Sequence, residues 1–415
     1  MSLKINGKRL KERLIALSEF GKDEAGGWSR FTWTDDYIRA KELVKQWMRE
    51  AGMTVREDAM GNVFGRLAGL DDSLPVVAAG SHIDSVKCGG MFDGNVGVLG
   101  ALEVITTIAE NKIKTKHPLE VIIFVEEDGA RFNWRILGAR AMVGEVARES
   151  LDKYKDKDGI SIAQAMEAAG YDPNKISEVK IDPKYYKCFF EMHIEQSHCL
   201  ESEGVSVGVV EGIFGSVWLK VTLKGRADHA GATPMKFRKD ALVAASEIII
   251  AMEKIAKEAG ETTVGTVGWI SVQPCMINTI PGIVEMTLDI RDINEKNLET
   301  AINNIRQFIG EVCKKRNIEV EIEEVVRFSP IHFPDHMIDT VEQAAKEEGI
   351  PFMRIASGAG HDAQALAKLI DVGMIFTPSR GGLSHCPDEY TDYEDIAKCA
   401  QVLLKAMLKK AEVVA

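Results

Sequence analysis

At 415 residues the chain is longer than one hydrophobic core usually supports, so we expect two domains. Hydrophobic residues make up 45% and charged residues 27%, as in ordinary globular proteins. The formal net charge of -12 leaves no excess of lysine and arginine to neutralise phosphates. This balance argues against a nucleic-acid partner, although a single well-placed arginine would still bind a small anionic substrate.

The sequence indicates neither a membrane span nor a secretion signal. No segment reaches the ~18–20 uninterrupted apolar residues that a spanning helix needs. The first 20 residues form an amphipathic pattern with charges throughout and no cleavage motif. The seven cysteines are odd in number and form no CxxC pair, which is typical of reduced thiols. We therefore expect a cytoplasmic protein without a membrane partner.

Helical and strand patterns alternate over the first half of the chain. The segment 120–125, EVIIFV, is a continuous apolar run of the kind found in strands covered on both faces. Such alternation predicts a layered α/β domain. We expect helices over 37–51 and 95–110 and further strands over 75–80 and 189–195.

The pattern changes in the middle of the chain to the order β-α-β-β-α-β, which is that of the ferredoxin-like unit. We expect strands over 217–224, 264–273, 283–291 and 318–326, and helices over 240–257 and 295–315.

After this insertion the α/β pattern returns. We predict a helix over 337–348, a strand over 373–376, and a last helix that is capped by Thr391 with Glu394 as a capping box. The predicted organisation is therefore α/β, with a layered domain over 1–212 and 330–415 and an inserted α+β domain over 213–329.

Histidine, aspartate and glutamate residues follow the predicted strands. In open α/β sheets, ligands gather at the carboxyl ends of strands. Histidine and carboxylate together suit a pair of divalent cations such as zinc or manganese, and three adjacent carboxylates would repel one another without a cation or solvent. From this pattern alone, a metal site and a set of ordinary polar residues both remain open. The residues concerned are His82, Asp84, Asp93, Glu126, Glu127, Asp128, His193 and His385.

Longer motifs carry a resemblance to a known family. GSHIDSV, GGMFDGNVG, EEDGARF, HIEQ, DHAGATPM, SGAGHDA and SHCPDE extend from about residue 80 to about residue 389. They resemble the N-carbamoyl-L-amino acid hydrolase and allantoate amidohydrolase family, within the group of co-catalytic zinc aminoacylases and carboxypeptidases. The resemblance implies an α/β catalytic domain with an inserted ferredoxin-like lid, which mediates homodimerisation.

The same resemblance implies two divalent metal ions per subunit (Zn²⁺, Mn²⁺, Co²⁺ or Ni²⁺). Asp93 would bridge both ions, and Asp84 would orient His82 as a neighbouring partner. Asp128 stands where the family usually has glutamate, so metal affinity or preference would differ because the side chain is one methylene shorter. The implied metal ligands are His82, Asp93, Asp128, His193 and His385.

The resemblance also implies a reaction. Glu127 would accept the proton of the attacking water and return it to the leaving amine. His229, on the lid, would stabilise the oxyanion in a partner subunit's site. Arg291 would clamp the substrate carboxylate as a planar fork. Gln196, Asn278 and Gly360 match further substrate-binding positions.

The substrate is open between two ureido compounds. N-carbamoyl-L-amino acids would give amino acid, CO₂ and ammonia, whereas allantoate carries two ureido groups. Allantoate hydrolases have an arginine at the start of the first lid strand, where this chain has Val217 and Trp218, so we favour carbamoyl amino acids. A non-catalytic member of the family is disfavoured because every ligand position holds a competent group. The preferred side chain, the native metal and the pathway stay open.

Overall fold

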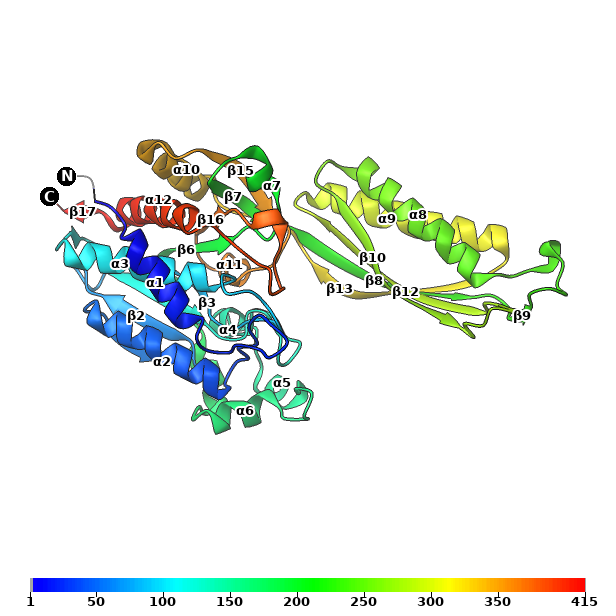
Figure 1. The fold of residues 1–415 in the computed structure, drawn as a ribbon, viewed down its shortest axis with the longest axis horizontal. Coiled ribbons are helices and arrows are strands. Elements are labelled where there is room, and N and C mark those ends of the chain that lie inside the picture. The colour runs from blue at the N-terminus through cyan, green and yellow to red at the C-terminus, as the bar shows by residue number, and fades with distance from the viewer. Residues whose placement is uncertain (1–2, 415) are drawn as a thin grey trace. The chain divides into compact units, whose positions relative to one another are not determined.

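The structure is a computed structural model that describes residues 3–414 (Figure 1). These residues form two compact units. Unit 1 comprises the chain up to Glu211 and from Phe333 onward, and unit 2 is Gly212–His332. The predicted insertion, 213–329, covers nearly the same residues as unit 2. The predicted fold class, an α/β domain interrupted by an α+β domain, is confirmed.

Most of a nine-stranded sheet, in the order β1-β2-β5-β3-β6-β16-β7-β14 with β15 beside β7, lies in unit 1, while its short strand β14 and the last two residues of β7 belong to the residues of unit 2. The central strands β5, β3, β6 and β16 run parallel, and antiparallel strands flank them. Every residue of β3 and β5 is buried, as the apolar runs predicted. The strands are β1 Thr54–Glu57, β2 Val63–Leu67, β3 Val76–His82, β5 Leu119–Phe124, β6 Tyr186–Ile194, β7 Val207–Ile213, β14 Ile331–His332, β15 Phe352–Ser357 and β16 Val372–Thr377.

Helices cover this sheet. Helix α3 is apolar on all sides and buried from Asn95 to Ile108, since it packs against β3, β5 and β6 while α1 and α12 pack against it in turn (Figure 1). The helices are α1 Gly7–Leu17, α2 Asp35–Glu50, α3 Asn95–Glu110, α4 Leu137–Met142, α5 Arg148–Lys153, α6 Ile162–Ala168, α7 Cys199–Glu203, α10 Asp335–Glu348, α11 Asp362–Leu366 and α12 Tyr393–Ala411. A two-stranded ribbon joins β4 Lys114–Thr115 to β17 Val413–Val414.

The cap predicted for the last helix was wrong by one residue. Asp392, not Thr391, is the N-cap of α12, and its carboxylate accepts a hydrogen bond from the Glu394 amide at 2.8 Å. Thr391 is buried. A carboxylate at this position satisfies a free amide and also interacts favourably with the positive end of the helix, which a threonine hydroxyl does less well.

Unit 2 has the predicted β-α-β-β-α-β order. Its sheet, β10-β12-β8-β13, is antiparallel throughout, which is the ferredoxin-like arrangement. Alternate residues of β8 are buried, since one face of the sheet packs against both helices. The elements are β8 Gly215–Lys224, α8 Ala241–Ala259, β10 Val264–Gln273, β12 Ile283–Asp292, α9 Glu295–Arg316 and β13 Glu319–Phe328, with a short ribbon of β9 Asp228–His229 and β11 Thr279–Ile280.

The helices of residues 3–414 are all too short or too polar to cross a lipid bilayer.

Candidate metal centre and active site

Four parallel strands deliver the predicted ligands to one edge of the sheet in unit 1. His82 is the last residue of β3 and lies beside Phe124, the last residue of β5. His193, near the end of β6, lies beside Phe376 on β16. The acidic segment that contains Asp128 follows β5. Because parallel strands end at the same edge of the sheet, residues that lie far apart in the sequence converge there.

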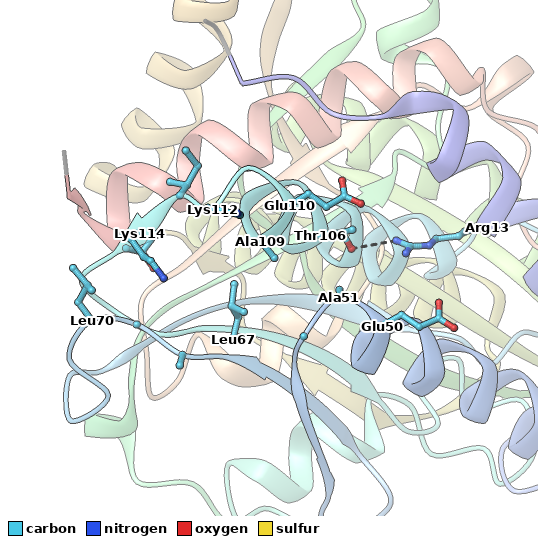
Figure 2. A pocket seen from close by; sticks show the side chains of 15 residues that line it. Arg13, Glu50, Ala51, Leu67, Leu70, Thr106, Ala109, Glu110, Lys112 and Lys114 are labelled. Atoms are coloured by element: carbon cyan, nitrogen blue, oxygen red, sulfur yellow. Dashed lines mark hydrogen bonds between the residues drawn. The ribbon is translucent and has the colours of Figure 1, made fainter.

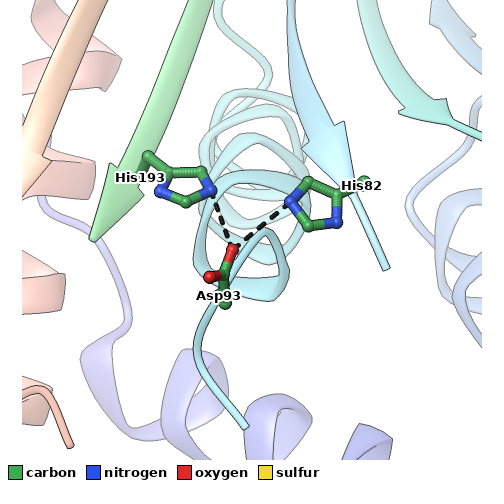
Figure 3. Close-up of side chains that lie close together, drawn as sticks. All are labelled: His82, Asp93 and His193. Carbon is green, nitrogen blue, oxygen red and sulfur yellow. Dashed lines mark ion pairs between the residues drawn. The ribbon is translucent and has the colours of Figure 1, made fainter. Parts of the chain in front are cut away.

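The first ligand group consists of His82, Asp93 and His193 (Figure 3). One carboxylate oxygen of Asp93, Oδ1, lies 3.4 Å from Nε2 of His82 and 3.1 Å from Nε2 of His193. All three side chains are buried. They come from the ends of β3 and β6 and from the loop before α3, so rigid elements hold them.

Backbone carbonyls fix the protonation of both imidazoles. Nδ1 of His82 lies 3.1 Å from the backbone oxygen of Asp84, and Nδ1 of His193 lies 2.9 Å from that of Ile194. Because a carbonyl oxygen only accepts, each Nδ1 carries the hydrogen when the ring is neutral. Each Nε2 then presents a lone pair toward Asp93, as a metal ligand must.

The second group consists of Asp93, Asp128 and His385. Nε2 of His385 lies 3.3 Å from Oδ2 of Asp93 and 3.4 Å from Oδ1 of Asp128. Hydrogen bonds to Asp128 and Asp93 raise the pKa of His385 to about 10, so these carboxylates strongly favour positive charge between them. The two oxygens of Asp93 therefore face different groups, which is the geometry of a bridging carboxylate.

The donor set fits divalent cations. Several buried polar atoms that face this region have no hydrogen-bond partner among the described residues, and unpaired buried polar atoms are costly unless something binds them. Imidazole nitrogens with carboxylate oxygens are the ligands of zinc and related ions. The atoms are Nε2 of His82, Oε1 of Glu127, Oδ2 of Asp128 and Oε1 of Gln196.

Gly94, between Asp93 and α3, leaves room for the first group. Its φ is +64°, and a Cβ there would lie 2.5 Å from Nε2 of His82. Any larger residue would both strain the backbone and occupy the space beside the imidazole. Glycine is therefore required at position 94, because the backbone of this loop lies close to the imidazole of His82.

Glu127 lies beside both groups. Its Oε2 is 3.7 Å from Nε2 of His82, and its side chain is 4% exposed. Burial raises the pKa of Glu127 to about 7, although Arg135 and His82 partly offset this. A carboxylate that titrates near neutrality is suited to accept a proton and return it.

Asp84 contacts His82 differently from the expected carboxylate–histidine contact. Its backbone oxygen accepts from the imidazole, while its carboxylate is 3.7 Å away from Nδ1. That carboxylate instead accepts hydrogen bonds from the amides of Glu127 at 3.3 Å and Asp128 at 3.2 Å. Asp84 therefore connects a histidine of the first group to the acidic segment of the second.

Gln196 and Gly360, predicted to bind substrate, also lie in unit 1. Nε2 of Gln196 donates to Oδ2 of Asp93 at 2.7 Å and lies 3.3 Å from Oγ of Ser384. Gly360 precedes His361, whose ring packs on that of His193 with centroids 4.5 Å apart. Gln196 contacts the bridging carboxylate directly, and Gly360 lies one residue from the histidine cluster.

His229 and Asn278 lie together in unit 2, His229 in β9 and Asn278 directly before β11. His229 pairs with Thr279, and the Ala230 amide donates to the backbone oxygen of Asn278 at 2.9 Å. Nδ1 of His229 accepts from the amides of Gly231 and Ala232, both at 3.0 Å. Nε2 of this exposed neutral ring therefore carries a hydrogen and can donate it.

Arg291 lies at the opposite end of β12 from this ribbon. It pairs in register with Ser216, whereas Ile283, at the end near the ribbon, pairs with Lys224. Eight residue steps along a strand span about 27 Å. Asp289 binds the Arg291 guanidinium, with Nη2 2.8 Å from Oδ2. Within unit 2, the predicted oxyanion donor and carboxylate clamp are therefore far apart.

Two further residues at the centre were not predicted from the sequence. Glu389, buried, accepts hydrogen bonds from the amides of Phe92 at 3.0 Å and Asp93 at 3.1 Å and from Ser384 at 2.9 Å, so it holds the bridging ligand in place. His361 forms a further group with Glu191 and His193. Both residues lie within recognised motifs, but Glu389 acts on amides almost 300 residues away, which no local pattern predicts.

A cavity of about 660 Å³ lies elsewhere in unit 1, beside the carboxyl ends of α2 and α3, and contains none of these residues (Figure 2). Arg13 at its wall donates to Thr106 at 3.3 Å. Its lining mixes Lys112 and Lys114 with Glu50 and Glu110, so its charge favours no ligand class. Size alone does not identify the reactive site.

Comparisons with known proteins agree with the motifs. An N-carbamoyl-L-amino acid amidohydrolase of Geobacillus stearothermophilus is 43% identical over 98% of this chain and 99% of its own length. An allantoate amidohydrolase of Bacillus subtilis is 34% identical over 95% of each chain. The crystal structure of a hydantoinase/carbamoylase family amidase from Burkholderia multivorans superposes with a TM-score of 0.93 at 37% identity and covers 99% of both chains.

The resemblance that the motifs indicated is thus confirmed. The model of peptidase family M20/M25/M40 matches residues 78–409, which is most of the chain. This protein belongs to peptidase family M20/M25/M40, a family of metal-dependent enzymes.

Proposed function

We propose that this protein is a metal-dependent amidohydrolase that cleaves the carbamoyl C–N bond of N-carbamoyl-L-amino acids to give amino acid, CO₂ and ammonia. The observation that carries the proposal is the position of Asp93, whose two oxygens face two separate ligand groups beside the buried Glu127. The name of the Geobacillus stearothermophilus relative supports the same substrate class.

Two divalent cations, Zn²⁺ or Mn²⁺ with Co²⁺ and Ni²⁺ as substitutes, fit the two groups. His82 and His193 would hold one and Asp128 and His385 the other, with Asp93 shared. When bound, such a pair polarises the substrate carbonyl and lowers the pKa of water toward neutrality.

Glu127 moves the proton in this proposal. Because burial raises its pKa to about 7, the carboxylate can accept a proton from the attacking water near neutral pH and release it again. The same oxygen then returns the proton to the leaving nitrogen. Asp84 keeps the Glu127 backbone in place by accepting its amide hydrogen.

Unit 2 would supply substrate contacts. Arg291 would bind the α-carboxylate, and Nε2–H of His229, with Asn278 beside it, would donate to the oxyanion. Arg291 lies near one end of β12 and His229 lies in the β9–β11 ribbon near the other end, and the eight residue steps of β12 between these ends span about 27 Å, which is longer than a carbamoyl amino acid. Both roles therefore require two chains, with His229 of one subunit serving the site of the other.

A homodimer formed through unit 2 meets that requirement. Strand β10 is an edge of its sheet, with Val264 49% exposed, and Ile250 on α8 is 75% exposed. Unpaired edges and exposed apolar side chains favour self-association around a twofold axis. In the proposed setting the dimer acts in the cytoplasm on a small molecule, without nucleic-acid or membrane partners.

Allantoate is the alternative substrate, since the Bacillus subtilis relative carries that name. At the start of β8, Val217 is fully buried, and Trp218, 43% exposed, is the neighbour that faces away from the core. Neither position holds an arginine that could contact the second ureido group of allantoate. This favours carbamoyl amino acids.

The test is ammonia release from N-carbamoyl-L-methionine, N-carbamoyl-β-alanine and allantoate, with zinc or manganese added. We expect the methionine compound to be turned over fastest. Glu127→Gln should abolish turnover while metal content stays unchanged, because this side chain moves the proton and is not a ligand. A metal-loaded protein that releases ammonia from none of the three would overturn the proposal.

A further inference from the structure

An arginine lies beside the proposed base. Arg135 lies in the segment that follows Glu127, where the chain folds back on itself. The Ile136 amide donates to the Glu127 oxygen at 2.8 Å, and the Gly138 amide donates to Val125 at 2.8 Å. These backbone bonds hold the segment against the end of β5, so Arg135 has a defined position.

The backbone of this segment adopts conformations that most residues avoid. Glu126, Asn133 and Ile136 have φ values of 54°, 56° and 50°. For a β-branched residue such as Ile136 this conformation is unfavourable, and such strain is typical of functional sites. Gly129 leaves room for the arginine, since a Cβ there would lie 2.9 Å from Cγ of Arg135.

The Arg135 side chain is partly exposed to solvent. Its Nη2 is 3.8 Å from Oε1 of Glu127, which is longer than a hydrogen bond, and the side chain is 47% exposed. Within residues 3–414 it makes no hydrogen bond. Arg131, four residues earlier, instead donates to the Thr32 oxygen at 2.7 Å and to Asp156 at 3.1 Å. One arginine of the segment thus supports the fold, while the other presents its donors beside the base.

We infer that Arg135 determines substrate specificity by binding a second carboxylate, that of an acidic amino-acid side chain. A planar guanidinium with free donors matches a carboxylate in two parallel hydrogen bonds. Asp93 and Asp128, also near Arg135, are the proposed metal ligands, so bound cations offset their charge and leave the guanidinium able to attract an anion. The inference rests on the proposed function and narrows the substrate class to N-carbamoyl dicarboxylic amino acids such as N-carbamoyl-L-aspartate and N-carbamoyl-L-glutamate.

The experiment compares kcat/KM for each acidic substrate with that for its uncharged amide, N-carbamoyl-L-asparagine or N-carbamoyl-L-glutamine. A hydrogen-bonded charge pair corresponds to roughly 10- to 100-fold in affinity. We expect the wild type to prefer an acidic substrate by about this factor, mainly through KM. Arg135→Gln should remove the preference, measured as the ratio of kcat/KM for the acidic substrate to that for its amide, because any effect of Arg135 on the neighbouring Glu127 is common to both substrates. Arg135→Lys should restore part of the preference.

Arg140 on α4 is a matched control. It is paired with Glu145 at 3.3 Å, so Arg140→Gln should leave the preference intact. A wild type without preference for acidic substrates would overturn the inference, as would an Arg135→Gln variant that loses activity equally on acidic and amide substrates. If N-carbamoyl-L-methionine is turned over but acidic substrates are not preferred, only this inference fails. If no carbamoyl substrate is turned over, the proposed function fails as well.

Discussion

The two ligand groups that share Asp93 differ in how they are built. The imidazoles of His82 and His193 are 0% and 2% exposed, sit at the ends of buried strands, and have their ring orientation fixed by backbone carbonyls. His385 is 43% exposed and lies in a loop with a φ of 57°. One position is thus rigid and dry, and the other is open to solvent on one side.

This difference has a chemical meaning. A rigid, desolvated set of ligands with fixed partners binds a cation tightly, whereas an exposed ligand on a loop tolerates changes in coordination. The exposed side is also where Gln196 contacts Asp93 and where a substrate would arrive. We infer a tightly held ion in the first group and a more exchangeable ion in the second.

The largest expected effect concerns the residue common to both groups. Asp93→Asn removes one charged oxygen from between the groups, so both ions should be lost and turnover should fall by at least about 1,000-fold. Metal analysis after dialysis, together with ammonia release, measures this. Asp158→Asn, at an exposed turn, is the control. A variant that retains both ions would break the view that Asp93 bridges them.

A smaller effect is expected for the difference in metal affinity between the two ligand groups. Titration of the loaded protein with a chelator should remove the ions in two phases, with affinities that differ by roughly 10- to 100-fold. His385→Ala should eliminate the weaker phase and keep the tighter ion, whereas His193→Ala should weaken the tighter phase. If His385→Ala removed the tightly held ion instead, the proposed order of affinity would be reversed.

The smallest expected effect concerns Asp128, where the motif resemblance leads us to expect glutamate. Asp128→Glu lengthens the side chain by one methylene and should change the affinity of the weaker ion by only a few-fold, because the exposed His385 can adjust. The tighter ion should be unaffected. Calorimetric metal binding measures both, and an altered tighter ion would show that the groups are mechanically coupled.

Much of this architecture could be predicted because the burial of strands leaves a regular pattern of apolar residues in the sequence. The apolar run 120–125 and the alternation in 217–224 correspond to β5 and β8, because burial on both faces or on one face leaves a periodic signal. The ligands at strand ends were predictable because parallel strands end at one edge of the sheet. Their division into two groups depends on the three-dimensional fold.

What the sequence did not indicate depends on contacts between a side chain and a distant backbone. The carboxylate of Asp84 binds the amides of Glu127 and Asp128, and that of Glu389 binds the amides of Phe92 and Asp93. An amide is present at every such position whatever the side chain, so no residue pattern marks it. The position of Arg135 likewise depends on the left-handed backbone conformations of the neighbouring Asn133 and Ile136, which the sequence does not indicate.

The most direct test of the two-ion centre is anomalous diffraction from crystals of the zinc- or manganese-loaded protein. Two peaks per subunit are predicted, one among His82, Asp93 and His193 and the other among Asp93, Asp128 and His385. A single peak, or peaks that lie away from Asp93 in a fully loaded active protein, would contradict the account.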